Sequence, residues 1–420
     1  MPELGSLPPG YQHLTPEMCL SCKGAKALCG LPCLWLKRVD ERLPAMRLNS
    51  QDLFGSSPPS VFVGRYGYPD VSLGPMLAPI HLEDSRAMEL DAPSQWLDRR
   101  IEDVVGMRSS LVRARRAMNV RDATRPSPLL RVTQDLALSS RPIDTEVHLR
   151  KRPNLELRAM LGDTLAPMGP SVEPDRVRLA GNPKVLPAVE RAHGDDDAKA
   201  ATAMGEMYRA GIPTDQIEKL LSVGLLGEAQ QRKIVPTRWS ITATDDQVGL
   251  GLLTKLRDFT PLDGVQFYEG NAHGNRFYVL VGPPPWSFDM IETWMKGAAW
   301  TLDDSPFKAD HEGPRGRKGY ASTVAGAYYA ARLAVLERLH RIRRNGCAMV
   351  YREITPDYWA PLGVWVIREG VRRILQSEPR VLRGWPEAIQ FARTRTLREG
   401  WERGSWLVGN RLHQKRVTEY

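Results

Sequence analysis

Four cysteines near the start of the chain place the tightest local constraint on its fold. Cys19, Cys22, Cys29 and Cys33 follow the spacing C-x2-C-x6-C-x3-C, so four of the five cysteines lie within fifteen residues. Glycine and proline between them permit the tight turns that let four thiolates converge, as a structural zinc site requires. Disulfides and an iron–sulfur cluster are the alternatives left open. We expect a small zinc knuckle over residues 1–40.

The length of the chain calls for more than this knuckle and one core. At 420 residues it exceeds the size that a single hydrophobic core comfortably fills, so two or more domains are expected. Strand-like and helical patterns are mixed, which predicts an α+β fold, and the run of three prolines at 283–285 predicts a domain boundary. The expected parts are the knuckle over 1–40, a mixed, sheet-containing α+β domain over 41–283, a mostly helical basic domain over 284–405 and a tail over 406–420.

Local patterns predict the main elements. A hairpin is expected over 265–281, and a β-branched strand over 234–246. The sequence predicts helices over 286–300, 323–345, 362–376 and 386–399, and strand or coil after Gly404.

The sequence also predicts where the protein works. No apolar run approaches the ~20 residues that a bilayer span needs, so no membrane segment is expected. Residues 1–14 contain proline and glycine rather than a basic patch followed by an apolar core, so no secretory signal is expected. We expect a cytoplasmic protein.

Positive charge is concentrated near the C-terminus. Residues 331–420 contain 18 Lys plus Arg and 9 Asp plus Glu, so they account for the entire net charge of +9. Nearly all of the cations are arginines, whose planar guanidinium suits phosphate oxygens, and such a one-sided segment is typical of a nucleic-acid contact. Arg338, Arg341 and Arg344 share one side of the expected helix and are candidate DNA contacts. A solvated helix face is the alternative.

Two glycine-bearing basic loops are candidate phosphate sites. Two strands from Ser60 onward flank Gly64-Arg65-Tyr66-Gly67-Tyr68-Pro69, which places Arg65 and Tyr66 where a backbone can approach a ligand closely. The second loop, over 313–322, runs directly into a long helix, so backbone N–H groups and the helix dipole would add to the side-chain charges. Its cations are Arg315, Arg317 and Lys318. A β-turn with packed tyrosines and a plain solvated loop are the respective alternatives.

Paired carboxylates near these loops suggest a divalent cation such as Mg²⁺. Asp245 and Asp246 follow Arg238 at the end of the expected strand, where they would hold a cation or cap the next helix. Asp303, with Asp304, forms a second acidic pair. If these groups share one cleft, they would support metal-assisted chemistry on a phosphate-bearing substrate.

The last seven residues, QKRVTEY, suggest a docking peptide. Spacing of three places Val417 and Tyr420 on one side of a single helical turn, with the amide of Gln414 at its edge. This pattern resembles the peptide by which proteins bind the sliding clamp of DNA replication. The alternative is a frayed terminus.

Several separated segments, in the same order, resemble the archaeal Nre family of DNA repair proteins over nearly the whole chain. They are the four-cysteine knuckle, FVGRYGYP, VPTRWSITATDD, ARTRTLREGW and QKRVTEY. The resemblance implies a two-part protein that binds the sliding clamp PCNA through its C-terminal peptide and acts in DNA repair. It matches Gln414, Val417 and Tyr420 to the clamp-binding peptide, and the cysteines to a zinc-finger-like segment. The single terminal aromatic departs from the usual two.

The resemblance names a pathway and a partner but no reaction. We expect a DNA repair protein that docks on PCNA, contacts DNA and associates with the nucleoid through the clamp. An enzyme acting on a phosphorylated small molecule and a repair scaffold without chemistry are the alternatives. The sequence contains no Ser-His-Asp order, metalloprotease helix or Walker motif.

Overall fold

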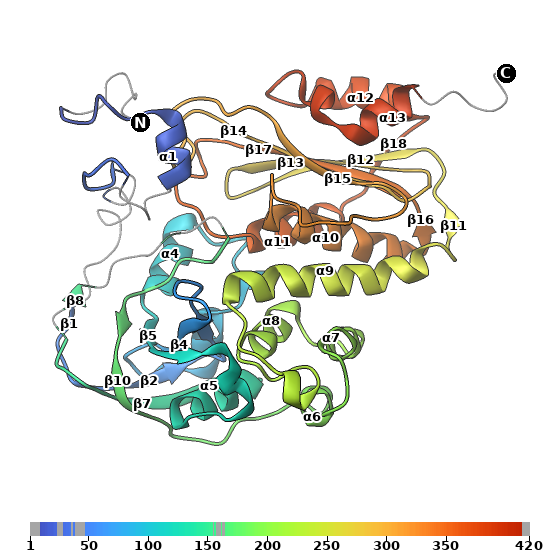
Figure 1. Ribbon diagram of the computed structural model, residues 1–420. Helices are drawn as coiled ribbons and strands as arrows, with labels where there is room; N and C mark the ends of the chain where they lie inside the picture. Colours follow the sequence, from blue (N-terminus) through green and yellow to red (C-terminus); the bar gives the residue numbers. More distant parts are fainter. Residues whose placement is uncertain are drawn as a thin grey trace. The chain divides into compact units, whose positions relative to one another are not determined.

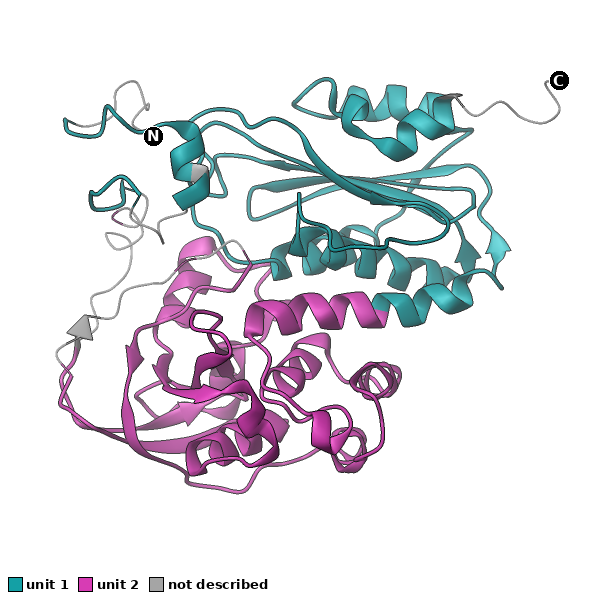
Figure 2. Ribbon diagram, viewed as in Figure 1, with its two compact units in different colours: residues 1–35, 249–420 teal, residues 36–248 magenta. Residues whose placement is uncertain are grey.

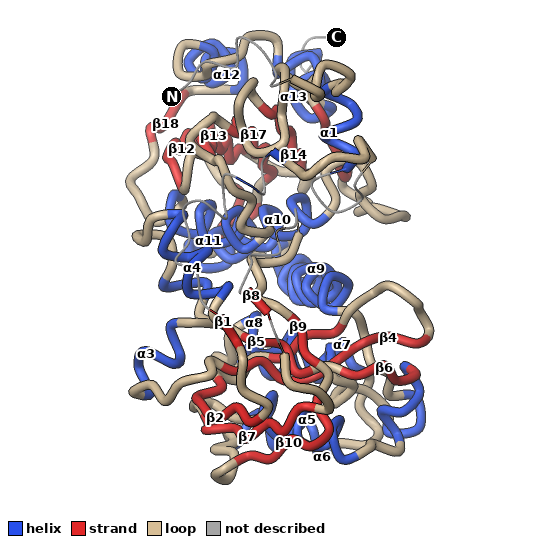
Figure 3. Tube along the Cα trace, turned by 90° about the vertical axis from the view of Figure 1, so that its left-hand side faces the viewer, coloured by secondary structure: helices blue, strands red, loops and turns tan. Residues whose placement is uncertain are grey.

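The computed structural model describes residues 9–22, 28–34, 37, 47–153, 155–156, 161 and 164–413. The chain divides into two units, coloured teal and magenta in Figure 2. Unit 1 contains residues 1–35 and 249–420, and unit 2 contains residues 36–248. Each unit combines helices with β-sheet (Figure 3), which confirms the α+β class.

Unit 2 is built on two main sheets. In the first, β10 (Pro174–Leu179), β7 (Ile143–Leu149) and β2 (Asp52–Ser57) pair antiparallel in that order. Alternate residues of β7 are buried, as expected for a strand with one face on a core. The second sheet has the order β3 (Val61–Val63), β4 (Asp70–Leu77), β5 (Val112–Ala114) and β9 (Ser171–Val172), with β6 (Arg116–Asn119) also pairing with β4, and a small ladder joins β1 (Arg47–Leu48) to β8 (Leu155–Glu156).

Helices complete the core of unit 2. They are α3 (Asp84–Glu89), α4 (Ile101–Ser109), α5 (Pro128–Leu138), α6 (Pro187–Gly194), α7 (Ala200–Arg209) and α8 (Thr214–Ser222), with short 3-10 turns η1 (Pro93–Gln95), η2 (Val120–Thr124) and η3 (Ala229–Gln231). Helix α5 begins where its sequence dictates, because the Ser127 hydroxyl accepts the Leu130 N–H and Pro128 occupies the first helical position. Helices α6 to α8 bury one apolar face in a shared cluster that includes Met207, Ile217 and Leu220.

Unit 1 contains a six-stranded sheet between two layers of helices (Figure 1). The strand order is β15 (Lys308–Glu312), β14 (Phe288–Trp294), β17 (Cys347–Ile354), β13 (Asn275–Gly282), β12 (Val265–Ala272) and β18 (Arg380–Leu382). Helices α10 (Gly326–Ile342) and α11 (Trp365–Ile374) cover one face, and α12 (Trp385–Arg393) and α13 (Trp406–His413) cover the other. Every residue of the central strand β17 is buried, as a strand covered on both faces requires.

The remaining elements of unit 1 are short, apart from one helix. They are α1 (Pro16–Cys22), the 3-10 turn η4 (Trp401–Gly404), and strands β11 (Thr260–Pro261) and β16 (Arg344–Asn345), which pair parallel. The 20-residue helix α9 (Thr237–Leu256) contains the division between the two units. Among the described residues, no helix is long and apolar enough to cross a membrane.

The hairpin over 265–281 and the helices near 323–345, 362–376 and 386–399 are confirmed as β12–β13, α10, α11 and α12. Three other local predictions are wrong. Residues 286–300 contain strand β14 rather than a helix, because a strand buried on both faces, with polar Asp289 and Glu292 buried too, shows no alternation that would mark it as a strand. Residues 237–246 belong to helix α9 rather than a strand, so β-branched propensity is overridden there. The segment after Gly404 forms helix α13, not strand or coil.

The predicted domain boundary at the triple proline does not separate compact units. Strands β13 and β14 lie on either side of it, and both pair with β17 in one sheet. The prolines therefore form a connection within a sheet. For the same reason residues 284–405 are not a mostly helical domain, because they supply β14, β15, β17 and β18 as well as helices.

Candidate functional site

The four clustered cysteines lie within the described residues, Cys19 and Cys22 on α1 and Cys29 and Cys33 in the segment that follows. Burial, followed by the negative charges of Cys33, Cys22 and Cys29, raises the pKa of Cys19 to about 11. Such mutual repulsion is what a bound cation relieves, and thiolates are the ligands that zinc prefers. The donor chemistry therefore fits zinc. Even so, no group of three or more His, Cys, Asp or Glu in the described part of the chain is arranged to hold a metal ion.

The first basic loop follows strand β3 in unit 2. Its tight turn is closed by the Asp70 N–H, which donates to the Gly67 carbonyl at 2.8 Å, and Gly67 has a φ of +84° that favours glycine. The guanidinium of Arg65 lies 5.1 Å from the centre of the Tyr66 ring, and both side chains are exposed. Tyr68 contacts Trp239 of α9, with ring centres 5.2 Å apart. The two segments that the sequence singles out separately, FVGRYGYP and VPTRWS, therefore meet in unit 2.

The carboxylates Asp245 and Asp246 lie in the middle of α9. Because the helix begins at Thr237, neither residue caps it, which corrects the capping alternative. Asp245 is 1% exposed, whereas Asp246 and Arg238 are half-buried. Burial of Asp245 makes it part of the packing of α9 rather than an open ligand at a strand end.

The second basic loop, over 313–322 in unit 1, is held by ion pairing within the protein. Arg317 donates to Asp310 at 2.8 Å and to the carbonyls of His311 and Gly319, also at 2.8 Å. The other oxygen of Asp310 accepts the N–H groups of Thr323 and Val324, each at 2.8 Å, just before α10 begins. The protein thus supplies its own anion at this helix start. Arg315 and Lys318 remain exposed on the loop.

The candidate DNA-contacting arginines do not share one helix face. Arg338 is half-buried, and its guanidinium lies 5.9 Å from the centre of the Tyr268 ring. Arg341 is exposed in the last turn of α10. The helix ends at Ile342 with Arg343 in the left-handed region, so Arg344 lies on strand β16 instead. Arg341 and Arg344 are exposed and Arg338 serves packing.

Asp303, the other candidate metal ligand, is exposed in the loop after β14 and accepts the N–H of Asp304 at 2.8 Å. It belongs to unit 1 with Arg315, Arg317 and Lys318, whereas Arg65, Tyr66, Arg238, Asp245 and Asp246 belong to unit 2. Neither unit by itself assembles the full predicted set. The one-cleft arrangement stays a prediction.

Gln414, Val417 and Tyr420 lie outside the described residues. The helix that precedes them, α13, is firmly attached to the sheet of unit 1. Asp289 of β14 accepts the Ser405 hydroxyl at 2.5 Å and the Leu407 N–H at 2.9 Å, and so caps this helix. Burial raises the pKa of Asp289 to about 6. At the other end, Arg411 donates to the carbonyl groups of the proline run at 3.1 to 3.4 Å.

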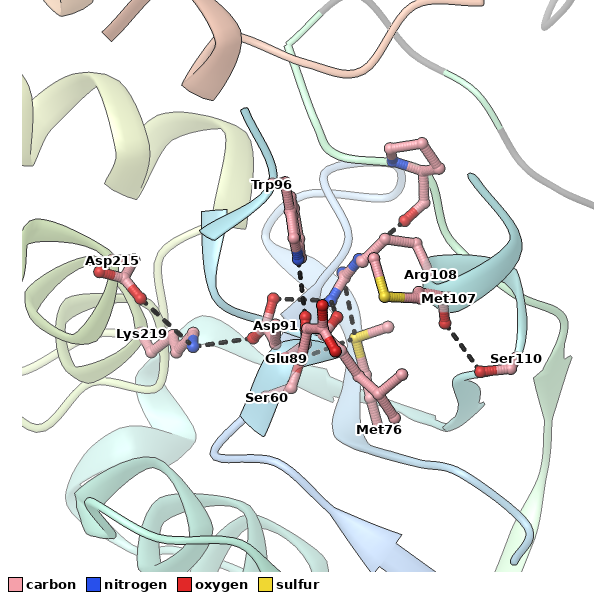
Figure 4. Close-up of polar contacts among 12 residues, drawn as sticks. Ser60, Met76, Glu89, Asp91, Trp96, Met107, Arg108, Ser110, Asp215 and Lys219 are labelled. Carbon is pink, nitrogen blue, oxygen red and sulfur yellow. Dashed lines mark hydrogen bonds and ion pairs between the residues drawn. The ribbon is translucent and has the colours of Figure 1, made fainter. Parts of the chain in front are cut away.

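Unit 2 also contains a buried ionic cluster that the sequence did not indicate (Figure 4). Asp91 accepts from Arg108 of α4 at 2.6 Å and from Lys219 of α8 at 2.7 Å. Burial alone would raise the pKa of Asp91, but Lys219 and Arg108 lower it below its usual value. Arg108 also donates to the carbonyls of Leu90 and Pro167. Because its members come from distant segments and are bonded to one another, the cluster joins α4 and α8 to the segment after α3 rather than presenting a reactive group.

Two family models match successive parts of the chain. The model of the archaeal Nre N-terminal region matches residues 28–301, and that of the archaeal Nre C-terminal region matches residues 312–420. Residues 302–311, between the two matches, contain most of β15, which pairs with β14 in the sheet of unit 1. No solved structure matches the chain.

Three curated relatives match most of the chain. DNA repair protein NreA of Archaeoglobus fulgidus is 36% identical over 383 residues, which cover 91% of this chain and 95% of the relative. DNA repair protein NreA of Haloferax volcanii is 39% identical over 338 residues, or 79% and 80% of the two chains. DNA repair protein NreB of Archaeoglobus fulgidus is 36% identical over 360 residues, or 85% and 87%. The two family models and these relatives together show that the chain belongs to the archaeal Nre family.

Proposed function

We propose that this protein acts in DNA repair, that it docks on the sliding clamp PCNA through residues 414–420, and that it contacts DNA. The observation that carries the proposal is the similarity over nearly the full length to three relatives that are each named DNA repair proteins. The similarity extends over 79% or more of this chain in each case, so it concerns the whole protein rather than one shared domain.

The attachment of α13 supports a docking role for the tail. A short peptide that orders only on its partner is most effective when the residue before it is fixed, because the length of the flexible connection sets the effective concentration. Asp289 and Arg411 fix α13, which ends at His413, immediately before Gln414. The apolar pair Val417 and Tyr420 would then fill the groove of the clamp as one helical turn.

Exposed arginines near the end of α10 support the DNA contact. Arg341 and Arg344 are exposed, whereas three later arginines of the basic C-terminal region form ion pairs within the fold. Arg393 pairs with Glu402 at 2.7 Å, Arg395 with Glu269 at 2.7 Å and Arg398 with Asp304 at 3.0 Å. We therefore propose the end of α10 as a phosphate contact, and changing Arg341 and Arg344 to Glu should weaken binding to all DNA sequences alike.

Co-migration with archaeal PCNA in size-exclusion chromatography tests the docking. Deletion of residues 414–420, or the double change Val417→Ala and Tyr420→Ala, should abolish co-migration and leave the melting temperature unchanged. A matched control is Val381→Ala with Tyr320→Ala, because these side chains are 65% and 56% exposed on unit 1. Full clamp affinity in the truncated chain would contradict the proposal.

We also propose that Cys19, Cys22, Cys29 and Cys33 hold one structural zinc ion. Four protein ligands leave no open position for a substrate, so the ion would stabilise the segment rather than catalyse. Elemental analysis should find about one zinc per chain, lost in Cys22→Ser and retained in Cys347→Ser, which changes a buried cysteine far from the cluster. A metal-free protein with an unchanged melting temperature would contradict this proposal.

Metal-dependent chemistry on a phosphate-bearing substrate stays a prediction, as do the alternatives of an enzyme acting on a phosphorylated small molecule and a scaffold without chemistry. Incubation with labelled flap, bubble and crosslinked DNA, with and without Mg²⁺ and ATP, separates a nuclease, an ATPase and a passive binder. Asp303→Ala and Arg315→Ala are suitable variants because both side chains are exposed in unit 1.

A further inference from the structure

Three large aromatic side chains are exposed together on unit 2, contrary to the usual burial of such residues. Tyr66 is 75% exposed, Tyr68 is 51% exposed and Trp239 is 44% exposed. Tyr68 and Trp239 are in contact with their ring planes tilted by 58°, so the rings do not cover each other face to face. We call Tyr66, Tyr68 and Trp239 the aromatic platform.

Hydrogen bonds donated by backbone N–H groups fix the segments that carry the aromatic platform. The Val63 N–H donates to the Thr237 hydroxyl at 2.9 Å and joins the end of β3 to the start of α9. Across the turn, the Gly64 N–H donates to the Ser72 carbonyl at 2.8 Å, and the Val120 N–H donates to the Pro69 carbonyl at 3.0 Å. The rings are therefore carried by a supported turn and by the first turn of a 20-residue helix, which is the kind of rigid base that binding surfaces need.

Cations and carboxylates both lie beside the aromatic platform, and Arg65 is the cation in contact with one of its rings. Arg65 lies against Tyr66 and is exposed, and Arg121 is exposed one residue after Val120. Two carboxylates also lie here, and hydrogen bonds from Asn119 orient both of them without removing their charge. Asp70 accepts from its side-chain amide at 2.8 Å, and Asp122 accepts from its backbone N–H at 3.0 Å. Arg65 is thus an exposed cation in contact with the exposed ring of Tyr66.

We propose that Arg65 and the aromatic platform bind single-stranded DNA, with unpaired bases stacked on the rings and phosphate paired with Arg65. Stacking on aromatic side chains is how proteins hold unpaired bases without reading their sequence. Bases within a duplex have their faces covered by neighbouring base pairs, so the platform distinguishes single-stranded from double-stranded DNA. This inference rests on the proposed DNA contact and adds the form of DNA that this surface of unit 2 takes.

Fluorescence anisotropy of the full-length protein with a labelled oligothymidylate of about 12 nucleotides tests the inference. Tyr66→Ala and Trp239→Ala should each weaken binding roughly tenfold, whereas Tyr66→Phe and Trp239→Phe, which keep an aromatic ring, should bind nearly as tightly as the unchanged protein. Tyr320→Ala is the matched control, because it removes a tyrosine that is 56% exposed on unit 1, and it should leave affinity unchanged.

Salt dependence separates stacking from charge. Changing Arg65 to Gln should lower the slope of log affinity against log salt by about 0.7, the value for one phosphate contact on a single strand. Tyr66→Ala should lower the affinity and leave that slope unchanged. If Trp239→Ala lowers the melting temperature, Tyr66→Ala decides the matter, since its side chain is the most exposed of the three.

Failure of this inference and failure of the proposed function give different results. Tight oligothymidylate binding that is insensitive to both Tyr66→Ala and Trp239→Ala would overturn the inference and leave the DNA contact standing, with the platform free for a protein partner. Absence of binding to both oligothymidylate and duplex DNA would overturn the inference and the DNA contact together. Co-migration with PCNA would still report separately on clamp docking.

Discussion

The two glycine-bearing basic loops have similar compositions, but their arginines have different partners. In the loop over 313–322, Arg317 is bonded to Asp310 and to backbone carbonyls, and the N–H groups before α10 are satisfied by the same carboxylate. In the turn over 64–69, Arg65 contacts only its exposed neighbour Tyr66 among the interactions that the structure gives for it. A basic loop is open to an external anion only where the protein has not supplied its own.

The largest expected effect is a loss of stability when Asp310, which pairs with Arg317 inside unit 1, is replaced. Asp310→Ala removes the acceptor for Arg317 and for two N–H groups at once, so it should lower the free energy of unfolding by about 4 kcal/mol. Asp303→Ala, an exposed carboxylate in the same unit, should change it by less than about 0.5 kcal/mol. Chemical denaturation measures both. Equal effects would show that Asp310 does not organise the loop.

Asp289 is a second carboxylate at a helix start, and its hydrogen-bond donors differ from those of Asp310. The donors to Asp289 are a hydroxyl and backbone N–H groups, in place of the guanidinium that pairs with Asp310. Burial raises the pKa of Asp289 from 3.8 to about 6, so the folded state binds more protons than the unfolded state between these pH values. Stability contributed by this group should therefore be full below about pH 4 and should fall as pH rises through 6.

One pKa unit corresponds to about 1.4 kcal/mol, so the full loss is on the order of 3 kcal/mol. Thermal melts from pH 3.5 to 7 should show this loss in the unchanged protein relative to Asp289→Asn, which cannot ionise. Asp303→Asn is the control and should follow the unchanged protein. A difference between Asp289→Asn and the unchanged protein that does not vary with pH would contradict the assignment.

The same substitution at the arginine of each loop, Arg317→Gln and Arg65→Gln, tests the comparison directly. Arg317→Gln should lower the free energy of unfolding by about 2 kcal/mol, because charge-assisted hydrogen bonds are lost, and should leave oligothymidylate binding unchanged. Arg65→Gln should change the free energy of unfolding by less than about 0.5 kcal/mol and should weaken oligothymidylate binding roughly threefold. If the two variants behave alike, the loops do not differ in the way proposed.

The secondary-structure elements that were predicted correctly depend on residues close together in the sequence. The hairpin β12–β13 and helices α10 to α12 follow from turn residues, periodicity and helix stops that lie within each segment. The helix predicted at β14 failed because a strand covered on both faces has no alternation to distinguish it from a buried helix. The boundary at the triple proline failed because pairing with β17 is decided by residues more than 50 positions away.

Contacts between residues far apart in the sequence also determine the candidate site. FVGRYGYP and VPTRWS could be recognised as unusual, but the contact between Tyr68 and Trp239 joins residues 171 positions apart, and no periodicity reports it. Asp310 lies before the basic loop, on a strand that was not predicted, so its pairing with Arg317 could not be anticipated. Sequence therefore identified candidate residues, and tertiary contacts decided which of them remain available to a partner.

The smallest expected effect compares one glycine in each loop. Gly67 and Gly316 both lie in the left-handed region, with φ of +84° and +74°. A side chain at Gly316 would meet nothing within 4 Å in the described part of the chain, so Gly316→Ala should cost about 1 kcal/mol from backbone strain alone. A Cβ at Gly67 would lie 2.6 Å from the Asp70 carbonyl oxygen, which is backbone and must shift, so Gly67→Ala should cost more.

Gly67 also separates Tyr66 from Tyr68, so its replacement should displace the rings of the platform and weaken oligothymidylate binding as well as stability. Gly316→Ala should leave that binding unchanged, because its loop is organised around Asp310 rather than around an external anion. Denaturation and anisotropy on the two variants measure both quantities. Equal stability losses, with oligothymidylate affinity unchanged in both proteins, would show that the conformation of the 64–69 turn does not position the aromatic rings.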